Sequence, residues 1–85
     1  MYPYSKEGIA RCLKEVCKTE SPVIPETFEC YSTQGIFGGK AEGEYHFATN
    51  DGKRYLMIVE GRLESDLFSS IRYKWTNIKS IEKLG

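Results

Sequence analysis

Three cysteines and one histidine are the side chains that could hold a metal ion in this chain. Structural zinc sites take their cysteines in close pairs from a turn. Cys12 and Cys17 lie five positions apart within a predicted helix, which separates them by about 140° around the helix axis. Small apolar residues beside a core explain this pair better. The sequence therefore predicts no metal site and no cofactor.

A cysteine nucleophile would need a histidine within hydrogen-bonding reach. The candidates are Cys30 and His46. Strand alternation groups Cys30 with Phe28, which is expected to point inward, and places His46 on the other side of the sheet. A carboxylate beside His46, from Glu29 or Glu44, could serve acid–base chemistry, but such pairs arise by chance on solvated strands. We expect no catalytic residue and no enzyme.

The glycine-rich segment 35–43 superficially resembles a phosphate-binding loop. That motif requires glycine at position 34 and serine or threonine at position 41, where this chain has Gln34 and Ala41. A strand also follows the segment, so no helix N-terminus is available for a phosphate. We expect a glycine-permitted corner whose Ile36 and Phe37 pack into the core. The alternative is a loop that presents Phe37 to a partner.

Basic and aromatic residues alternate at Arg72-Tyr73-Lys74-Trp75, as they do on surfaces that bind single-stranded nucleic acid. In a strand, Tyr73 and Trp75 would face the core, whereas Arg72 and Lys74 would point away from it. An ordinary amphipathic strand with basic side chains on its solvent face is the favoured interpretation. A nucleic-acid surface remains the alternative.

The bulk properties narrow the class of protein. The 85 residues, 1–85, fit one domain. Twelve basic residues balance twelve acidic ones, which disfavours non-specific phosphate binding. An odd number of cysteines, and charges at Lys6, Glu7 and Arg11 that interrupt any signal peptide, indicate the cytoplasm. The longest apolar run, 55–59, is too short to span a membrane.

An amphipathic helix of about 13 residues is predicted near the N-terminus. Ser5 is a suitable N-cap. Ile9, Leu13 and Val16 follow at the spacing of one helix face. Gly8 weakens the first turns, because glycine costs up to about 1 kcal/mol relative to alanine in a helix.

Antiparallel strands are predicted for the rest of the chain. Alternation, β-branched residues and aromatic residues indicate the strands. The tail, 76–85, fits either a short helix or a last edge strand. The predicted strands are 27–33, 42–49, 54–60 and 67–75.

Two turns set the predicted register. Asp51-Gly52 favours a two-residue type I′ hairpin, which places Phe47 opposite Leu56. A four-residue loop at 63–66 would place Leu56 opposite Tyr73. Opposed residues share a face, so the helix should cover one face that collects the following residues: Tyr45, Phe47, Leu56, Ile58, Ile71, Tyr73 and Trp75.

The second sheet face is then predicted to meet a partner. It would carry an apolar strip along its central strand, although a solvated face normally alternates to polar residues. Its predicted anchors are Tyr55, Met57 and Val59, and its polar rim is His46, Arg72 and Lys74.

These patterns predict an α+β fold, in which one N-terminal amphipathic helix packs on an antiparallel sheet of four strands, or five if the tail adds one. The predicted function is a small non-enzymatic protein-binding module of the regulator or inhibitor type. It would use the second sheet face for a protein partner or for a second copy of the chain. A nucleic-acid-binding domain that uses an aromatic and basic sheet face is the alternative, and no membrane is expected.

Overall fold

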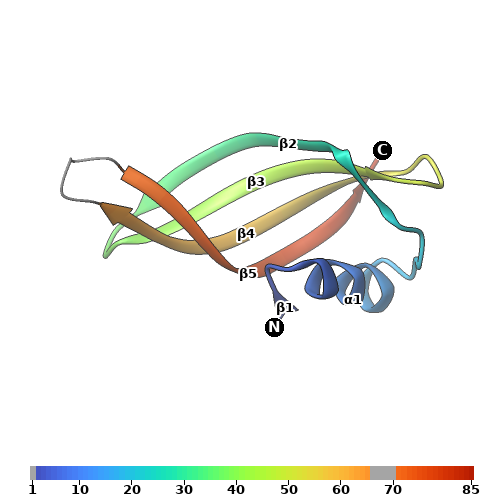
Figure 1. Ribbon diagram of the computed structural model, residues 1–85, viewed down its shortest axis with the longest axis horizontal. Helices are drawn as coiled ribbons and strands as arrows, with labels where there is room; N and C mark the ends of the chain where they lie inside the picture. The colour runs from blue at the N-terminus through green and yellow to red at the C-terminus, as the bar shows by residue number, and fades with distance from the viewer. Residues whose placement is uncertain (1, 66–70) are drawn as a thin grey trace.

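The computed structural model describes residues 2–65 and 71–85. Within these residues the chain forms one helix and one antiparallel sheet with the strand order β1-β5-β4-β3-β2, so the class is α+β and the sheet has five strands rather than four. Figure 1 shows α1 against one half of the twisted sheet, while the β2–β3 turn and the paired ends of β4 and β5 project beyond it at the left. The elements are β1 (Tyr2–Pro3), α1 (Lys6–Val16), β2 (Val23–Ile36), β3 (Lys40–Thr49), β4 (Arg54–Ser65) and β5 (Ile71–Leu84).

The helix begins where its cap predicts. The Ser5 hydroxyl oxygen accepts a hydrogen bond of 3.0 Å from the backbone N–H of Gly8, and α1 spans 11 residues. Ile9 and Leu13 are buried as expected, but Val16 is 55% exposed. Gly8 is not simply a weak point, because a Cβ there would lie 1.9 Å from the carbonyl oxygen of Pro3. Glycine therefore lets α1 approach β1.

The turn between β3 and β4 differs from the predicted one. The N–H of Gly52 donates to the carbonyl of Thr49 (2.9 Å), and the N–H of Thr49 donates to the carbonyl of Lys53 (3.0 Å). Gly52 has a φ of 82°. Among the described non-glycine residues only Lys18 has a positive φ, so Asp51 does not. A type I′ turn needs positive φ at both central residues. The connection is instead a three-residue loop closed by a left-handed glycine.

This loop shifts the register of β4 by one residue. Phe47 pairs with Tyr55 instead of Leu56. A one-residue shift moves every side chain of a strand to the other face, so the predicted face of Leu56 and Ile58 is wrong. We call the face under α1 the inner face and the opposite one the outer face; on the inner face of β4 lie Tyr55, Met57 and Val59.

The predicted loop at 63–66 is also wrong where the structure describes it. β4 continues to Ser65, which pairs with Ile71, and Leu56 pairs with Glu82. Two predicted core residues are consequently exposed, Ile71 at 68% and Tyr73 at 39%. Asp66, Ser70 and the first part of the predicted strand 67–75 lie outside the described residues.

The tail forms the second half of β5, neither a helix nor a separate strand. Ile78 pairs with β4 directly before a register shift that leaves Lys79 unpaired, and a second shift leaves Thr76 unpaired. Each of these β-bulges adds one residue to β5. Trp75, Ile78 and Ile81 therefore all face inward although they are three positions apart. The helix-like spacing in the sequence has this cause.

The core lies between α1 and the inner face of β3, β4 and β5. Its two largest side chains, Tyr55 and Phe47, are at most 1% exposed, and Met57 is 0% exposed. Phe28 from β2 stacks on Phe47 with ring centroids 5.1 Å apart. The remaining buried apolar residues of this cluster are Ile9, Cys12, Leu13, Val59, Ile78 and Ile81.

Candidate functional site

The three predicted anchors of the docking face are core residues. Tyr55 is 1% exposed, and Met57 and Val59 are 0% exposed. They cannot contact a partner while the fold is intact, so that part of the predicted site is wrong. The apolar residues that do lie on the outer face of β4 are Leu56 and Ile58, and both are half-buried.

The polar residues of the predicted site do not form one group. His46 lies on the outer face, where its ring stacks on Tyr31 at 4.6 Å and 7°. It pairs with Leu56 on β4, whereas Lys74 pairs with Arg62. Six residues of a strand span about 20 Å. His46 is therefore separated from Arg72 and Lys74, which are both exposed.

The end of the sheet beyond α1 carries most of the large exposed apolar side chains. We call residues 37–40, 62–65 and 71–75 the distal end. Phe37, at the tip of the β2–β3 turn, is 98% exposed, and Ile71 and Tyr73 are exposed as described above. The carbonyl of Gly39 accepts a hydrogen bond of 2.8 Å from the N–H of Leu63, and Leu63 pairs with Tyr73. The turn is thereby tied to the strand pair that carries the other two side chains.

The expectation that Phe37 packs into the core is wrong. Gly38 and Gly39 follow it with φ values of 86° and 81°, and these left-handed positions turn the chain tightly back into β3. A tight turn at the end of the sheet that α1 does not cover has no core beneath it (Figure 1). The double glycine was the signal in the sequence that Phe37 occupies a turn.

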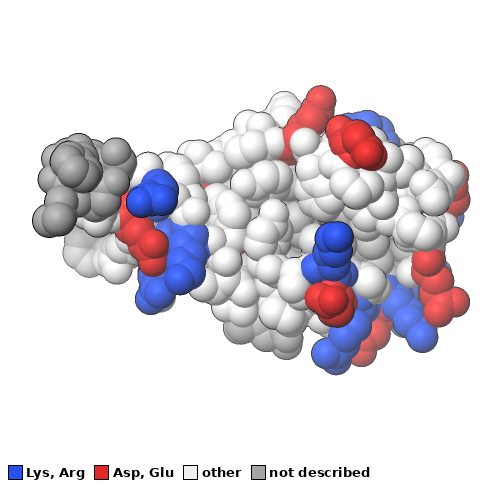
Figure 2. Space-filling model, in the orientation of Figure 1, with Lys and Arg blue, Asp and Glu red and all other residues white. Residues whose placement is uncertain are grey.

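Cations outnumber carboxylates at the distal end. The strand pairing sets Lys40 beside Arg62 and Arg62 beside Lys74. Glu64 is within 3.5 Å of Arg62 and 3.9 Å of Lys74. Arg72 adds a further positive charge. The described residues of this end therefore carry four cations and one carboxylate, that of Glu64. Figure 2 shows blue side chains with red beside them at the left, separated by uncharged surface from the charges near α1.

A rigid aromatic group supports the exposed Tyr73. Its ring stacks on Trp75 with centroids 5.4 Å apart and an interplanar angle of 15°. The indole Nε1–H of Trp75 donates a hydrogen bond of 2.8 Å to the phenol oxygen of Tyr45. Burial raises the pKa of Tyr45, which keeps this phenol neutral. Tyr73 is therefore held in place from the inner face.

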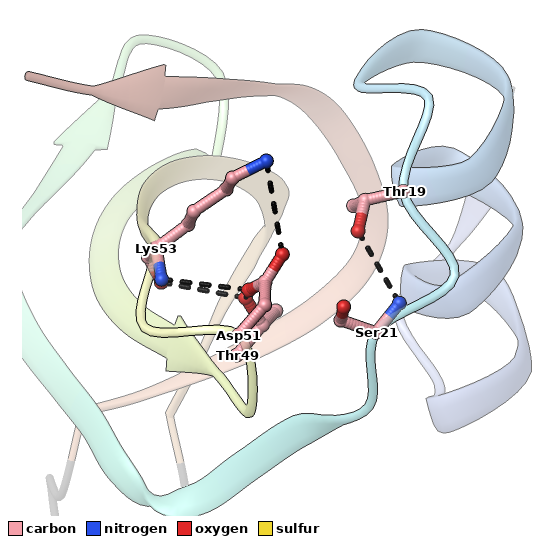
Figure 3. A network of polar contacts seen from close by, with 5 residues as sticks. All are labelled: Thr19, Ser21, Thr49, Asp51 and Lys53. Carbon is pink, nitrogen blue, oxygen red and sulfur yellow. Dashed lines mark hydrogen bonds and ion pairs between the residues drawn. The ribbon is translucent and has the colours of Figure 1, made fainter.

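At the opposite end of the sheet, a polar network holds the β3–β4 turn in place (Figure 3). The buried hydroxyl of Thr49 donates to the carboxylate of Asp51, and the backbone N–H of Lys53 donates to the same carboxylate at 3.4 Å. The hydrogen bond from Thr49, with a smaller contribution from Ser21, lowers the pKa of Asp51. Ser21 belongs to the connection that follows α1. The backbone N–H of Ser21 donates to the hydroxyl of Thr19 at 3.2 Å. The network fastens this connection beside the β3–β4 turn.

The remaining reactive side chains lie apart from one another. Cys30 pairs with Tyr45, and its neighbour Glu29 pairs with His46, so the cysteine and the histidine point to opposite faces. Within residues 2–65 and 71–85, no three His, Cys, Asp or Glu side chains converge as metal ligands would. The described residues also contain no helix long and apolar enough to cross a membrane.

Comparison of the chain with models of protein families, with curated proteins and with solved structures finds no match.

Proposed function

We propose that this protein is a non-enzymatic protein-binding module whose distal end binds an acidic segment of a partner. One observation carries the proposal: three large apolar side chains, Phe37, Ile71 and Tyr73, are exposed at the end of the sheet where cations are in excess. Large apolar side chains left exposed at one end of a small protein are a common feature of interaction sites. The segment would contact both faces of the distal end in this proposal, because Ile71 and Tyr73 lie on the inner face whereas Lys40 and Lys74 lie on the outer face.

The two kinds of side chain have different roles. Binding energy concentrates in aromatic anchors near the centre of an interface, which Phe37 and Tyr73 would supply. Rim charges act mainly on the association rate and on partner choice. Lys40 and Lys74 would therefore select a segment that carries carboxylates around one or two apolar residues.

A peptide-display selection on the immobilised protein tests the proposal. We expect the selected peptides to be acidic and to contain an apolar residue. Phe37→Ser should lower their affinity by about tenfold or more, as expected for an anchor worth at least 1.4 kcal/mol. Tyr31→Ser is the matched control, because Tyr31 is 70% exposed but lies on the outer face near His46. Peptides that bind Phe37→Ser as tightly as the unaltered protein would contradict the proposal.

Nucleic acid is the second candidate, because aromatic and basic side chains occur together at the distal end. Binding that neutralises several phosphates weakens steeply as salt rises. The test is titration of a single-stranded and a double-stranded oligonucleotide at two salt concentrations. Tight, salt-dependent binding of the single strand that is lost in Phe37→Ser and Lys74→Glu would replace the protein partner by nucleic acid.

Self-association is the remaining variant of the proposal. Sedimentation of the unaltered protein and of Phe37→Ser distinguishes the cases, since a dimer formed through the distal end should dissociate in the variant. We further propose a cytoplasmic location. The free thiols of Cys12, Cys17 and Cys30 support it, because a reducing compartment keeps thiols unpaired.

A further inference from the structure

A groove of about 680 Å³ separates α1 from the first part of β2. Its volume falls within the range of about 300–1,000 Å³ that is usual for small-molecule sites. It lies at the other half of the molecule from the distal end and contains none of the distal residues. The lining residues are mainly apolar and come from the segment before α1, from α1, from the α1–β2 connection and from β2; among them are Tyr4, Ile9, Leu13, Val23, Pro25 and Phe28.

One small residue keeps the groove open along the helix. Lys6, Ala10 and Lys14 follow one another at four-residue spacing, and all three line the groove. Residues at this spacing form one row on a helix surface. Ala10 in the middle of the row is exposed and short, so no long side chain covers the groove between Lys6 and Lys14; Ile9 and Leu13 beneath it belong to the core.

The side of the groove formed by β2 and the residues before it is poorly suited to pair with the backbone of an extended peptide. Pro22 and Pro25 line the groove, and proline has no backbone N–H to offer to a neighbouring strand. Between Ile24 and Glu29 the pairing with β3 is irregular, and the hydroxyl of Thr27 accepts the N–H of Ala48 at 2.7 Å. Prolines and bulges are the features that protect an edge strand from pairing. An extended peptide therefore fits this groove poorly.

The charges at the rim indicate the head group of a ligand. Lys14 forms an ion pair with Glu20 at 3.3 Å. Lys6, at the other end of the row, is exposed and has no ion pair within the described residues; Tyr4 and Ser5 line the same groove. An apolar groove with one uncompensated ammonium group at its mouth is complementary to an apolar chain that ends in one negative charge.

We infer that the groove between α1 and β2 binds a free fatty acid. Its alkyl chain lies against Ala10, Val23 and Phe28, and its carboxylate pairs with Lys6. The site is independent of the distal end, so the protein would bind this ligand whether or not the distal end has a partner.

Binding of dodecanoate, measured by calorimetry and by displacement of a fluorescent anilinonaphthalene sulfonate, tests the inference. Ala10→Phe fills the groove from an exposed position and should lower the affinity for dodecanoate by about tenfold or more. Val16→Phe is the matched control, since Val16 is exposed on the same helix but does not line the groove. Lys6→Gln should weaken dodecanoate about threefold to fivefold, as expected for one exposed ion pair, and 1-dodecanol should be insensitive to it.

Three outcomes would overturn the inference. If dodecanoate does not bind, or if it binds Ala10→Phe as tightly as the unaltered protein, the groove is not a fatty-acid site. Equal effects of Lys6→Gln on dodecanoate and dodecanol remove the carboxylate contact. A dimer in sedimentation that Ala10→Phe dissociates, without dodecanoate binding, would assign the groove to a second copy of the chain.

Discussion

The indole of Trp75 on β5 donates its hydrogen bond to Tyr45 on β3 across the strand that lies between them. Two glycines make room for this contact. A Cβ at Gly43 would lie 2.7 Å from the indole ring, and a Cβ at Gly61 would lie 1.9 Å from the carbonyl oxygen of Lys74. The aromatic support of the distal end thus depends on positions that carry no side chain.

Replacement of Gly43 by alanine should displace this ring. The indole is rigid, so we expect a loss of about 1–3 kcal/mol in the free energy of unfolding, as for other overpacked sites. The emission of the single tryptophan should shift with it. Gly35→Ala is the matched control, because the Cβ there meets a terminal methyl of Leu63, which can rotate away. Equal losses in the two variants would contradict a rigid Trp75.

The register of β4 predicts opposite outcomes for two adjacent residues. Met57→Asp buries a charge at a position that is 0% exposed and should prevent folding, because unpaired buried charges cost several kcal/mol. Leu56→Asp changes a half-buried residue of the outer face and should remain folded with a lower melting temperature. Circular dichroism and urea titration measure both. A folded Met57→Asp would show that the register is wrong.

The Asp51 network predicts a dependence of stability on pH. The folded state lowers the pKa of Asp51, so its carboxylate stabilises the fold above the ordinary carboxyl range near pH 3.9. This stabilisation is lost as the pH falls through the lowered pKa. Urea titrations at several pH values should therefore give a smaller acid-induced loss in Asp51→Asn. Thr49→Val should reduce the same loss, since it removes the main cause of the shift. Parallel curves for all three proteins would contradict this role.

Gly8→Ala should destabilise the protein although alanine favours helices by about 1 kcal/mol. The added methyl group would strike the carbonyl oxygen of Pro3, so either α1 or β1 must move. We expect a lower melting temperature and faster hydrogen exchange at the β1–β5 pairing of Tyr2 and Ile78. A melting temperature above that of the unaltered protein would show that helix propensity outweighs this contact.

Local patterns in the sequence determined the helix and most of the strands. The cap at Ser5 and the spacing of Ile9 and Leu13 involve neighbours within two turns, so these features depend little on the rest of the fold. Alternation likewise predicted that Arg72 and Lys74 point outward. These predictions needed no contact between distant parts of the chain.

Only the tertiary structure decided which face of β4 is buried. Residues 55–59 are all apolar, so alternation does not distinguish the two faces. Asp51-Gly52 fits both a two-residue turn and the three-residue loop that forms, and these differ by one residue of register. The flanking charges carried the missing signal: Arg54, Glu60 and Arg62 all fall on the face of Leu56, and burying that face would bury charges. The exposure of Phe37 and the groove beside Ala10 likewise follow from how far α1 reaches across the sheet, which is a property of the assembled fold.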